Sequence, residues 1–380
     1  MMAPMLWLAL ALFLCAVVLA VVLSSMATVF MRKEAVQDPV ETDLPHLSLV
    51  IAARNAGSTL PLLLQDIRAQ SYPRERTEVI VVDDASEDDT FGIATGMQRN
   101  WKELQVMKAD GVGKKAAITT GVARSTGDLV LLTDADGRCG PDRLATLARH
   151  WRSSKADLVL MPVRTISEGG PLGRLQEDEQ AALLGIGFGG ASMGWRTMAY
   201  GANLAFTRAA FHGVGGYDGD RYASGDDVFL LQRMRAAGRT IEVLLDPCAL
   251  VTVSAERSWS AFVSQRIRWA GKMKGAGIGV QLIGLLVMAM PFALLWASLS
   301  FKPVQAMGEQ AFQTTALLIA SWCLLLVPVL RLVGTVRCFL GQSTSLPIAF
   351  LSYSAFTVYA PVIAIVSRFV RPLWKGRRIR

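Results

Sequence analysis

Two pairs of carboxylates each follow a short, mostly apolar run, an arrangement that could hold a cation. Asp83 and Asp84 follow the run 78–82, and Asp134 and Asp136 follow the run 128–133. Alternate residues of an extended chain point to the same side, so Asp134 and Asp136 would present their carboxylates together. Oxygen ligands at this spacing suit Mg²⁺ or Mn²⁺, which proteins usually hold with one or two carboxylates and the phosphates of a substrate.

A single acid after a strand is more often a helix cap or a turn residue than a ligand. The functional interpretation therefore depends on two acidic pairs that would meet at one edge of a sheet. A cation held there would stabilise negative charge on a departing diphosphate. The three histidines, His46, His150 and His212, are scattered along the chain, so carboxylate oxygens are the expected ligands.

A third acidic pair, Asp226-Asp227, follows Gly225 and begins a helical segment. One interpretation is that these acids cap the helix and compensate its dipole. The other is that one carboxylate faces a cleft and acts as a general base, within hydrogen-bond reach of an attacking hydroxyl. The spacing leaves both interpretations open.

The segment 255–274 combines an apolar helix face with basic and polar residues, which is typical of a helix that lies on a membrane surface. Near its end, Arg268 stands beside Trp269. A guanidinium offers a fork of donors for phosphate, and an indole offers a flat surface for a sugar or a base. The two interpretations are compatible with each other.

Strands are predicted at 47–53, 78–82 and 128–133, with helical spacing of apolar residues between them. Strands that alternate with helices predict an α/β fold in which a parallel sheet is covered on both faces. Ligands of such sheets bind outside the carboxyl ends of the strands. The first two acidic pairs fall at those ends, so the predicted elements would bring them together.

The composition indicates a membrane protein, because 52% of the 380 residues are hydrophobic and only 18% are charged. Uncharged stretches long enough to cross a bilayer occur at 1–31, 275–301, 310–330 and 338–367. We therefore predict the following parts: an N-terminal transmembrane anchor at 1–31, a linker at 32–46, a cytoplasmic catalytic domain at 47–254, an amphipathic interfacial segment at 255–274, transmembrane segments at 275–301 and 310–333, a transmembrane or re-entrant segment at 338–367, and a basic tail at 368–380.

The first stretch could be a signal peptide, but Arg32-Lys33 follows it as a stop signal would, and we interpret it as an anchor with its basic flank inside. Three further crossings would then put the basic tail outside, against the positive-inside rule. Gly341, Pro347 and Pro361 interrupt the last stretch, which makes it the best candidate for a segment that does not cross.

The formal net charge of +8 does not predict a nucleic-acid partner, because the positive residues form no stripe with interleaved aromatic residues. Six of them end the chain and favour contact with anionic lipid: Arg368, Arg371, Lys375, Arg377, Arg378 and Arg380. The five cysteines show no CxxC spacing, so the sequence supports neither a disulfide framework nor a zinc site.

Taken in order, these motifs resemble glycosyltransferase family 2, in particular membrane-integrated members such as ceramide glucosyltransferase and the cellulose, chitin and hyaluronan synthases. The resemblance covers roughly 47–274. The landmarks are Ala53-Arg54-Asn55, 81–86 with Asp88 and Thr90, 113–117, Asp134-Ala135-Asp136, 201–206, Asp226-Asp227 and 265–269. No landmark is specific alone, but their common order is.

The resemblance implies a GT-A fold, a nucleotide-binding α/β domain with a mixed sheet, and transfer with inversion at the anomeric carbon. Its site residues carry over as follows: Asp83 and Asp84 at the uridine of the donor, Lys114 near donor groups, Asp134 and Asp136 as the DxD motif for Mg²⁺ or Mn²⁺ and diphosphate, Asp227 as the base, Gln265, Arg268 and Trp269 as the QxxRW motif, and Arg54, Asn203 and Asp226 as possible supporting residues.

The chain departs from the family pattern at Asp226, where the family usually has Glu, and the shorter acid leaves the substrate specificity open. The membrane part is also smaller than that of the polymer synthases. We therefore expect transfer of a sugar from a nucleotide donor, with UDP expected, to a lipid or lipid-linked acceptor. A processive polysaccharide synthase and a catalytically silent membrane scaffold are the alternatives. The expected location is a cell membrane, with a bacterial inner membrane favoured.

Overall fold

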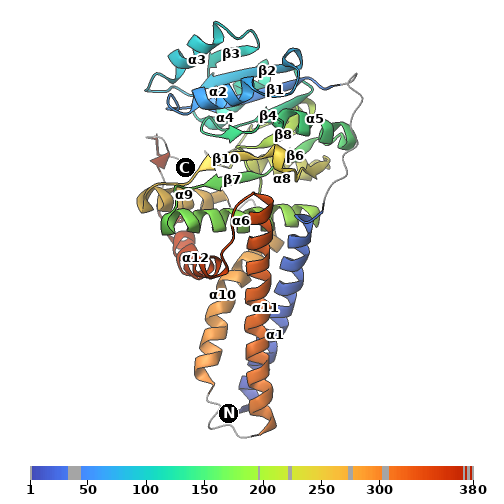
Figure 1. The fold of residues 1–380 in the computed structure, drawn as a ribbon, viewed down its shortest axis with the longest axis vertical. Coiled ribbons are helices and arrows are strands. Elements are labelled where there is room, and N and C mark those ends of the chain that lie inside the picture. The colour runs from blue at the N-terminus through green and yellow to red at the C-terminus, as the bar shows by residue number, and fades with distance from the viewer. Residues whose placement is uncertain are drawn as a thin grey trace.

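The computed structural model describes residues 2–32, 44–195, 197–220, 225–272, 277–301, 308–370, 373–374 and 377–378. It places an α/β domain on top of a group of long apolar helices (Figure 1).

A seven-stranded sheet in the order β3-β2-β1-β4-β8-β6-β9 forms the centre of the α/β domain. The strands are β1 (Leu47–Ala53), β2 (Thr77–Asp83), β3 (Leu104–Lys108), β4 (Leu129–Leu132), β6 (Leu158–Leu160), β8 (Leu204–Thr207) and β9 (Ile241–Val243). The three strands predicted from the sequence are β1, β2 and β4, and they pair in parallel. β8 runs antiparallel to both of its neighbours, so the sheet is mixed.

Helices cover both faces of this sheet because its inner strands alternate their side chains between two apolar cores. Val50 and Ile80 belong to the core that includes α4, whereas Leu49 and Val79 belong to the core that includes α2 and α5. The helices of the domain are α2 (Leu60–Arg68), α3 (Thr90–Gln98), α4 (Lys114–Arg124), α5 (Arg143–Ser154), α7 (Arg208–Gly213) and α8 (Asp226–Ala236), with 3₁₀ turns η1 (Arg74–Arg76) and η2 (Pro247–Ala249).

A three-stranded sheet in the order β5-β10-β7 lies between the main sheet and the apolar helices (Figure 1). Its strands are β5 (Arg138–Cys139), β7 (Val163–Ile166) and β10 (Val251–Ser254). β10 leads into α9 (Trp259–Lys272), and β7 leads into α6 (Gly170–Ser192), which runs across the base of the domain (Figure 1). A two-stranded hairpin, β11 (Leu373–Trp374) and β12 (Arg377–Arg378), lies close to the end of the chain.

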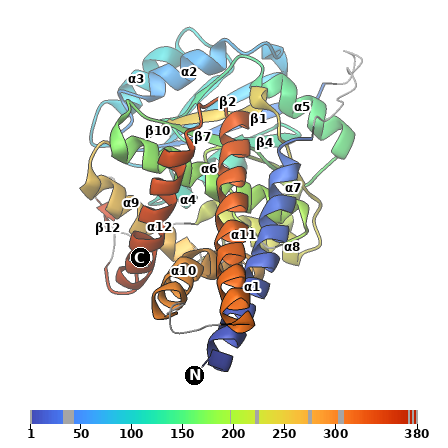
Figure 2. The same ribbon diagram turned by 60° about the horizontal axis from the view of Figure 1, so that its bottom comes forward.

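Four helices are long and apolar enough to cross a membrane: α1 (Met2–Val29), α10 (Ile278–Ser300), α11 (Glu309–Phe339) and α12 (Leu346–Val366). α1, α10 and α11 run side by side away from the domain (Figure 1). α12 takes a different direction. It is seen nearly end-on in Figure 1 and lengthwise in Figure 2, and it packs against α6 and α9 under the domain.

Buried ion pairs connect α6 to these helices. Arg337 of α11 lies 2.8 Å from Asp178 and 3.2 Å from Glu177, measured between guanidinium nitrogen and carboxylate oxygen. Ser352 of α12 donates a hydrogen bond to Asp178 as well. Because buried charges need partners, these contacts fix the position of α11 and α12 against the α/β domain.

Candidate active site

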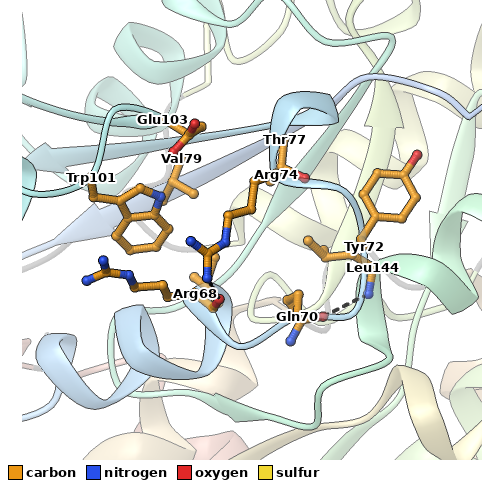
Figure 3. Close-up of a pocket in the computed structure, with 10 residues that line it drawn as sticks. Arg68, Gln70, Tyr72, Arg74, Thr77, Val79, Trp101, Glu103 and Leu144 are labelled. Atoms are coloured by element: carbon orange, nitrogen blue, oxygen red, sulfur yellow. Dashed lines mark hydrogen bonds between the residues drawn. The ribbon is translucent and has the colours of Figure 1, made fainter.

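The small cavity drawn in Figure 3 does not hold the predicted site residues. It has a volume of about 20 Å³ and lies at the start of β2, where Thr77 and Val79 line it. Asp83 stands at the other end of the same strand. In this cavity region the Tyr72 hydroxyl donates to the carbonyl of Pro45 at 2.6 Å, and Gln70 accepts a hydrogen bond from the Leu144 amide (Figure 3).

Three of the predicted site residues, Lys114, Asp134 and Asp226, meet at the opposite edge of the sheet. Lys114 Nζ lies 2.8 Å from Asp134 Oδ1 and 2.8 Å from Asp226 Oδ2, so one ammonium joins the turn after β4 to the start of α8. Burial acts to lower the pKa of Lys114, but the two carboxylates outweigh it and hold the pKa well above its usual value. The lysine therefore remains a cation between the two acids.

Gly201 allows this close contact. A Cβ atom at this position would lie 2.7 Å from Asp226 Oδ2 and 3.0 Å from Lys114 Nζ, which is too short for the carboxylate. The amide of Gly201 also donates to Asp227 Oδ2 at 3.1 Å. The residue thus contributes a bare backbone to the site, and any side chain would displace the charged groups.

Asp227 is held by two backbone amides at the first turn of α8. Its Oδ2 accepts from Gly201 and its Oδ1 accepts from Val228 at 2.8 Å. Its side chain is buried, and so is that of Asp226. A helix N-terminus stabilises negative charge, so both carboxylates are fixed in orientation and favourably placed electrostatically. These contacts agree with the interpretation as a helix-capping pair, and the general-base interpretation stays a prediction.

Asp83 and Asp84 lie buried at the carboxyl end of β2. Asp84 Oδ1 accepts a hydrogen bond from the Gly113 amide at 2.7 Å, which connects the acid to the start of α4. Asp83 Oδ2 accepts from the Ser86 amide, while Asp83 Oδ1 has no hydrogen-bond partner in the described part of the chain. A buried acceptor of this kind is costly unless a ligand satisfies it.

Arg54 supports this edge from below. Its Nη1 donates to the carbonyls of Asp84 and Ala85, at 2.9 Å and 2.5 Å, and its Nη2 pairs with Glu87. Ala85 adopts a positive φ of 50°, a strained conformation for a residue with a side chain. Arg54 therefore secures the turn that carries the acids.

The side chain of Asn203 connects three other segments of the domain by hydrogen bonds. Its side-chain oxygen accepts from Arg143 Nη2 at 2.8 Å, and its nitrogen donates to the carbonyls of Pro162 and Ala249. Arg143 also donates to Thr133, next to Asp134. The sequence did not single out Arg143, because an arginine near a helix start looks like a surface residue, yet it is fully buried and connects the Asp134 turn to the 201–203 segment.

The predicted QxxRW residues lie on α9. Gln265 donates to Glu256 at 2.8 Å. Burial lowers the pKa of Arg268, while the negative charges of Asp134, Glu256, Asp226 and Asp136 oppose this shift. Arg268 is thus within electrostatic range of these acids.

Trp269 contacts a residue that the sequence did not single out. The Arg266 guanidinium lies 4.3 Å from the ring centroid of Trp269 and 4.3 Å from that of Phe262, and it pairs with Glu179 of α6 at 2.5 Å. One face of the Trp269 ring is therefore used to fix α9 to α6. The only sequence signal for this contact was the acidic run 177–179 inside a helix that is mostly apolar.

Asp134 and Asp136 suit a hard cation by their donor chemistry. Both offer carboxylate oxygens, Asp134 with a side chain 35% exposed and Asp136 on the surface. Within the described ranges, no group of three or more His, Cys, Asp or Glu side chains could hold a metal ion. A cation at Asp134 and Asp136 would therefore need phosphate oxygens from a substrate to complete its ligands.

A mixed α/β sheet with acids at the carboxyl ends of its strands defines a GT-A-like domain, and the helices below it are long and apolar enough to span a membrane. Residues 48–215 match the model of the family described as "Glycosyl transferase family 2". This part of the chain is a glycosyltransferase family 2 domain, and the resemblance inferred from the motifs is confirmed.

The chain is similar to the "Probable glycosyltransferase YdaM" of Bacillus subtilis, with 27% identity over 60% of this chain and 55% of the relative. It is also similar to the "Poly-beta-1,6-N-acetyl-D-glucosamine synthase" of Staphylococcus aureus, with 24% identity over 60% of this chain and 54% of the relative. A "Beta-monoglucosyldiacylglycerol synthase" of Nostoc is 25% identical over 36% of this chain and 30% of the relative. The chain thus spans about half the length, or less, of these curated relatives.

Among solved structures, a mannosyltransferase of Pyrobaculum calidifontis in complex with GDP-Man and Mn²⁺ matches 98% of this chain and 100% of its own, with a TM-score of 0.57 and 21% identity. Because the sequence identity is only 21%, this match shows similarity of fold alone. It confirms the predicted GT-A-like architecture, including the mixed sheet that the resemblance implied.

Proposed function

We propose that this chain is a membrane-embedded, inverting glycosyltransferase that transfers a sugar from a nucleotide diphosphate donor, UDP being expected, to a lipid or lipid-linked acceptor. The observation that carries the proposal is the junction of Lys114 with Asp134 and Asp226, beside Asp227. It brings three separately predicted motifs of a family 2 domain into one site.

In this proposal Asp227 takes the proton of the acceptor hydroxyl, and the oxygen then attacks the anomeric carbon while the bond to the diphosphate breaks. The two backbone amides that hold Asp227 keep its carboxylate in one orientation, which favours proton transfer to a positioned base. A single displacement of this kind depends mainly on positioning and needs no covalent intermediate on the protein.

The leaving diphosphate would meet Lys114, which lies 2.8 Å from Asp134 and Asp226, and Arg268, whose pKa is influenced by the same acids. Asp134 and Asp136 would hold Mg²⁺ or Mn²⁺ together with the diphosphate, and the bound cation would neutralise its developing charge. The mannosyltransferase with a similar fold contains Mn²⁺ and GDP-Man, which supports a divalent cation and a nucleotide donor. The buried, unpaired oxygen of Asp83 would accept from an N–H group of the base.

We further propose that the protein lies in a cell membrane, a bacterial inner membrane being favoured, with its catalytic domain in the cytoplasm. Three spans, α1, α10 and α11, would leave the basic C-terminal tail on the same side as the domain if α12 lies along the membrane surface. This arrangement removes the conflict with the positive-inside rule. In this proposal, residues 47–254 form the catalytic domain and residues 255–274 form the interfacial segment, as predicted from the sequence.

A processive polysaccharide synthase is the second candidate. It is favoured by the similarity to the poly-β-1,6-N-acetylglucosamine synthase and by Gln265, Arg268 and Trp269 on α9. The length of the product distinguishes the two candidates, since a processive synthase makes a series of longer polymers and a single-sugar transferase makes one product with one added sugar.

The test is release of nucleotide diphosphate by the purified protein in lipid, offered UDP-glucose, UDP-galactose, UDP-N-acetylglucosamine or GDP-mannose with Mn²⁺ or Mg²⁺ and a membrane lipid extract. We expect release with one donor, loss of release with a chelator, and a glycolipid product. Asp134→Ala should weaken cation-dependent donor binding, measured by calorimetry. Folded protein that releases nucleotide with none of these donors and forms no product would contradict the proposal.

A further inference from the structure

Two buried side chains of α6 contact α9 and the segment that leads into it. Gln176 and Glu179 lie three positions apart on α6, so they project from the same side of the helix, and both are buried. Gln176 bonds to the segment before α9, and Glu179 bonds to α9 itself. The proposed mechanism uses neither residue, although both lie next to the QxxRW motif.

Gln176 fixes the position of Glu256. Its side chain accepts a hydrogen bond from the Glu256 amide at 2.8 Å and donates one to the Glu256 carbonyl at 2.9 Å. A glutamine side chain has both an acceptor and donors, so it can hold both backbone groups of one residue. The Glu256 carboxylate in turn accepts from Gln265 Nε2 at 2.8 Å. The first residue of the motif is therefore connected to α6 through Glu256.

Glu179 fixes Arg266, which lies inside the motif. Glu179 Oε2 is 2.7 Å from Arg266 Nε and 2.5 Å from Arg266 Nη2, so two nitrogens of the guanidinium share one carboxylate oxygen. Arg266 is 5% exposed and Glu179 is 8% exposed. Because a buried charge needs a partner, this pair holds the guanidinium in one place.

The fixed guanidinium of Arg266 contacts both ends of the motif. Its Nη1 donates to Gln265 Oε1, so the oxygen and the nitrogen of that side chain both have partners. The guanidinium also lies 4.3 Å from the ring centroids of Phe262 and Trp269, which stand one helical turn before it and after it. A planar guanidinium can stack on rings and form several directed hydrogen bonds at once, whereas a lysine ammonium cannot replace it in both tasks.

We propose that Arg266, held by Glu179, is a positioning residue for the QxxRW motif. It sets the orientation of Gln265 and Trp269 and thereby the geometry of the site that receives the leaving diphosphate. Arg266 acts through these two side chains and does not touch the substrate. This inference rests on the proposed function, in which the motif serves the transfer. Its size follows from geometry, since a displacement of about 1 Å at a reacting site can cost about 100-fold in rate.

The test compares Arg266→Met with the double variant Arg266→Met/Glu179→Met, both in the full-length protein in lipid. The single variant leaves Glu179 buried and unpaired, so its unfolding midpoint should fall. The double variant removes both charges, and its midpoint should return toward wild type. We expect kcat per folded protein to stay about 100-fold below wild type in both variants. Recovery of kcat together with the midpoint would overturn the inference, because Arg266 would then only stabilise the fold.

Arg266→Lys is a second variant that should fold even if the double variant does not, because it keeps a positive charge beside Glu179. It loses the bond to Gln265 and the flat face against Trp269. We expect kcat to fall about 10-fold, the effect of one lost hydrogen bond to a charged group. Wild-type kcat in Arg266→Lys would also overturn the inference.

Arg337→Met is the matched control. It breaks buried ion pairs of the same helix α6, but with α11 and not with α9. It should lower the unfolding midpoint and leave kcat per folded protein at the wild-type value. An equal loss of kcat in this control would overturn a specific role for Arg266. Full activity of the double variant beside an active wild type would leave the proposed function standing, whereas a folded wild type that turns over no donor would overturn both.

Discussion

Lys114 Nζ and Asp226 Oδ2 lie 2.8 Å apart, although the first belongs to α4 and the second to α8. The same nitrogen also pairs with Asp134, so three segments distant in sequence depend on one ammonium. Without it, the two carboxylates would face each other as like charges at close range, which is unfavourable in a partly buried site.

Lys114→Met should therefore lower both activity and stability. We expect turnover to fall at least about 100-fold, because the variant loses a charge-assisted pair with each of two acids. Nucleotide release and the midpoint of thermal unfolding are the measurements. Lys102→Met, at an exposed position of the same domain, is the control and should match wild type. Wild-type turnover in Lys114→Met would exclude a role for this junction in catalysis.

Asp227→Asn tests the proposed base. Asn keeps one acceptor oxygen, for either the Gly201 or the Val228 amide, and places an NH2 group against the other donor. It cannot take up a proton, and we expect a folded protein with a slightly lower unfolding midpoint. We expect turnover to fall about 100- to 10,000-fold, with donor affinity within a factor of a few of wild type by calorimetry. Asp226→Asn provides the comparison: if only that variant lost turnover, the base would be Asp226.

Gly201→Ala tests the close approach at the site. Its Cβ would lie 2.7 Å from Asp226 Oδ2, so the carboxylate must move away from Lys114. A misplacement of about 1 Å can cost about 100-fold in rate, and we expect a loss of that order with little change in circular dichroism. Gly96→Ala is the control, since nothing lies within 4 Å of a Cβ there. Equal activity of both variants would show that the contact is not needed.

Arg337→Met tests the connection between α11 and the domain. Removing one partner of a buried ion pair costs about 3–5 kcal/mol, because the remaining charge stays buried. Arg337 is 2% exposed and pairs with Glu177 and Asp178, so we expect a marked fall in the unfolding midpoint in detergent. Arg331→Met, on the exposed side of the same helix, should have little effect. A lower unfolding midpoint for Arg331→Met than for Arg337→Met would argue against the ion pairs of Arg337 as the connection between α11 and α6.

The local sequence determined the elements of this protein and their order. The runs that became β1, β2 and β4 are continuous and apolar because the strands are buried on both faces, and the acids after them mark where the strands end. The long uncharged stretches predicted the four helices that are long and apolar enough to cross a membrane, since that property depends on length and composition alone. Ordered motifs then indicated the family, which the match to 48–215 confirms.

Only the tertiary structure decided which residues meet. Nothing near Lys114 in the sequence indicates that it joins Asp134 to Asp226, because a side-chain contact between distant segments depends on how the helices pack. The same holds for Arg143 and Arg266: both are buried, and each pairs with a residue from a distant part of the chain, Asn203 for the first and Glu179 for the second. The direction of α12 was also set by packing, here against α6 and α9, since its composition equally suits a helix that crosses a membrane.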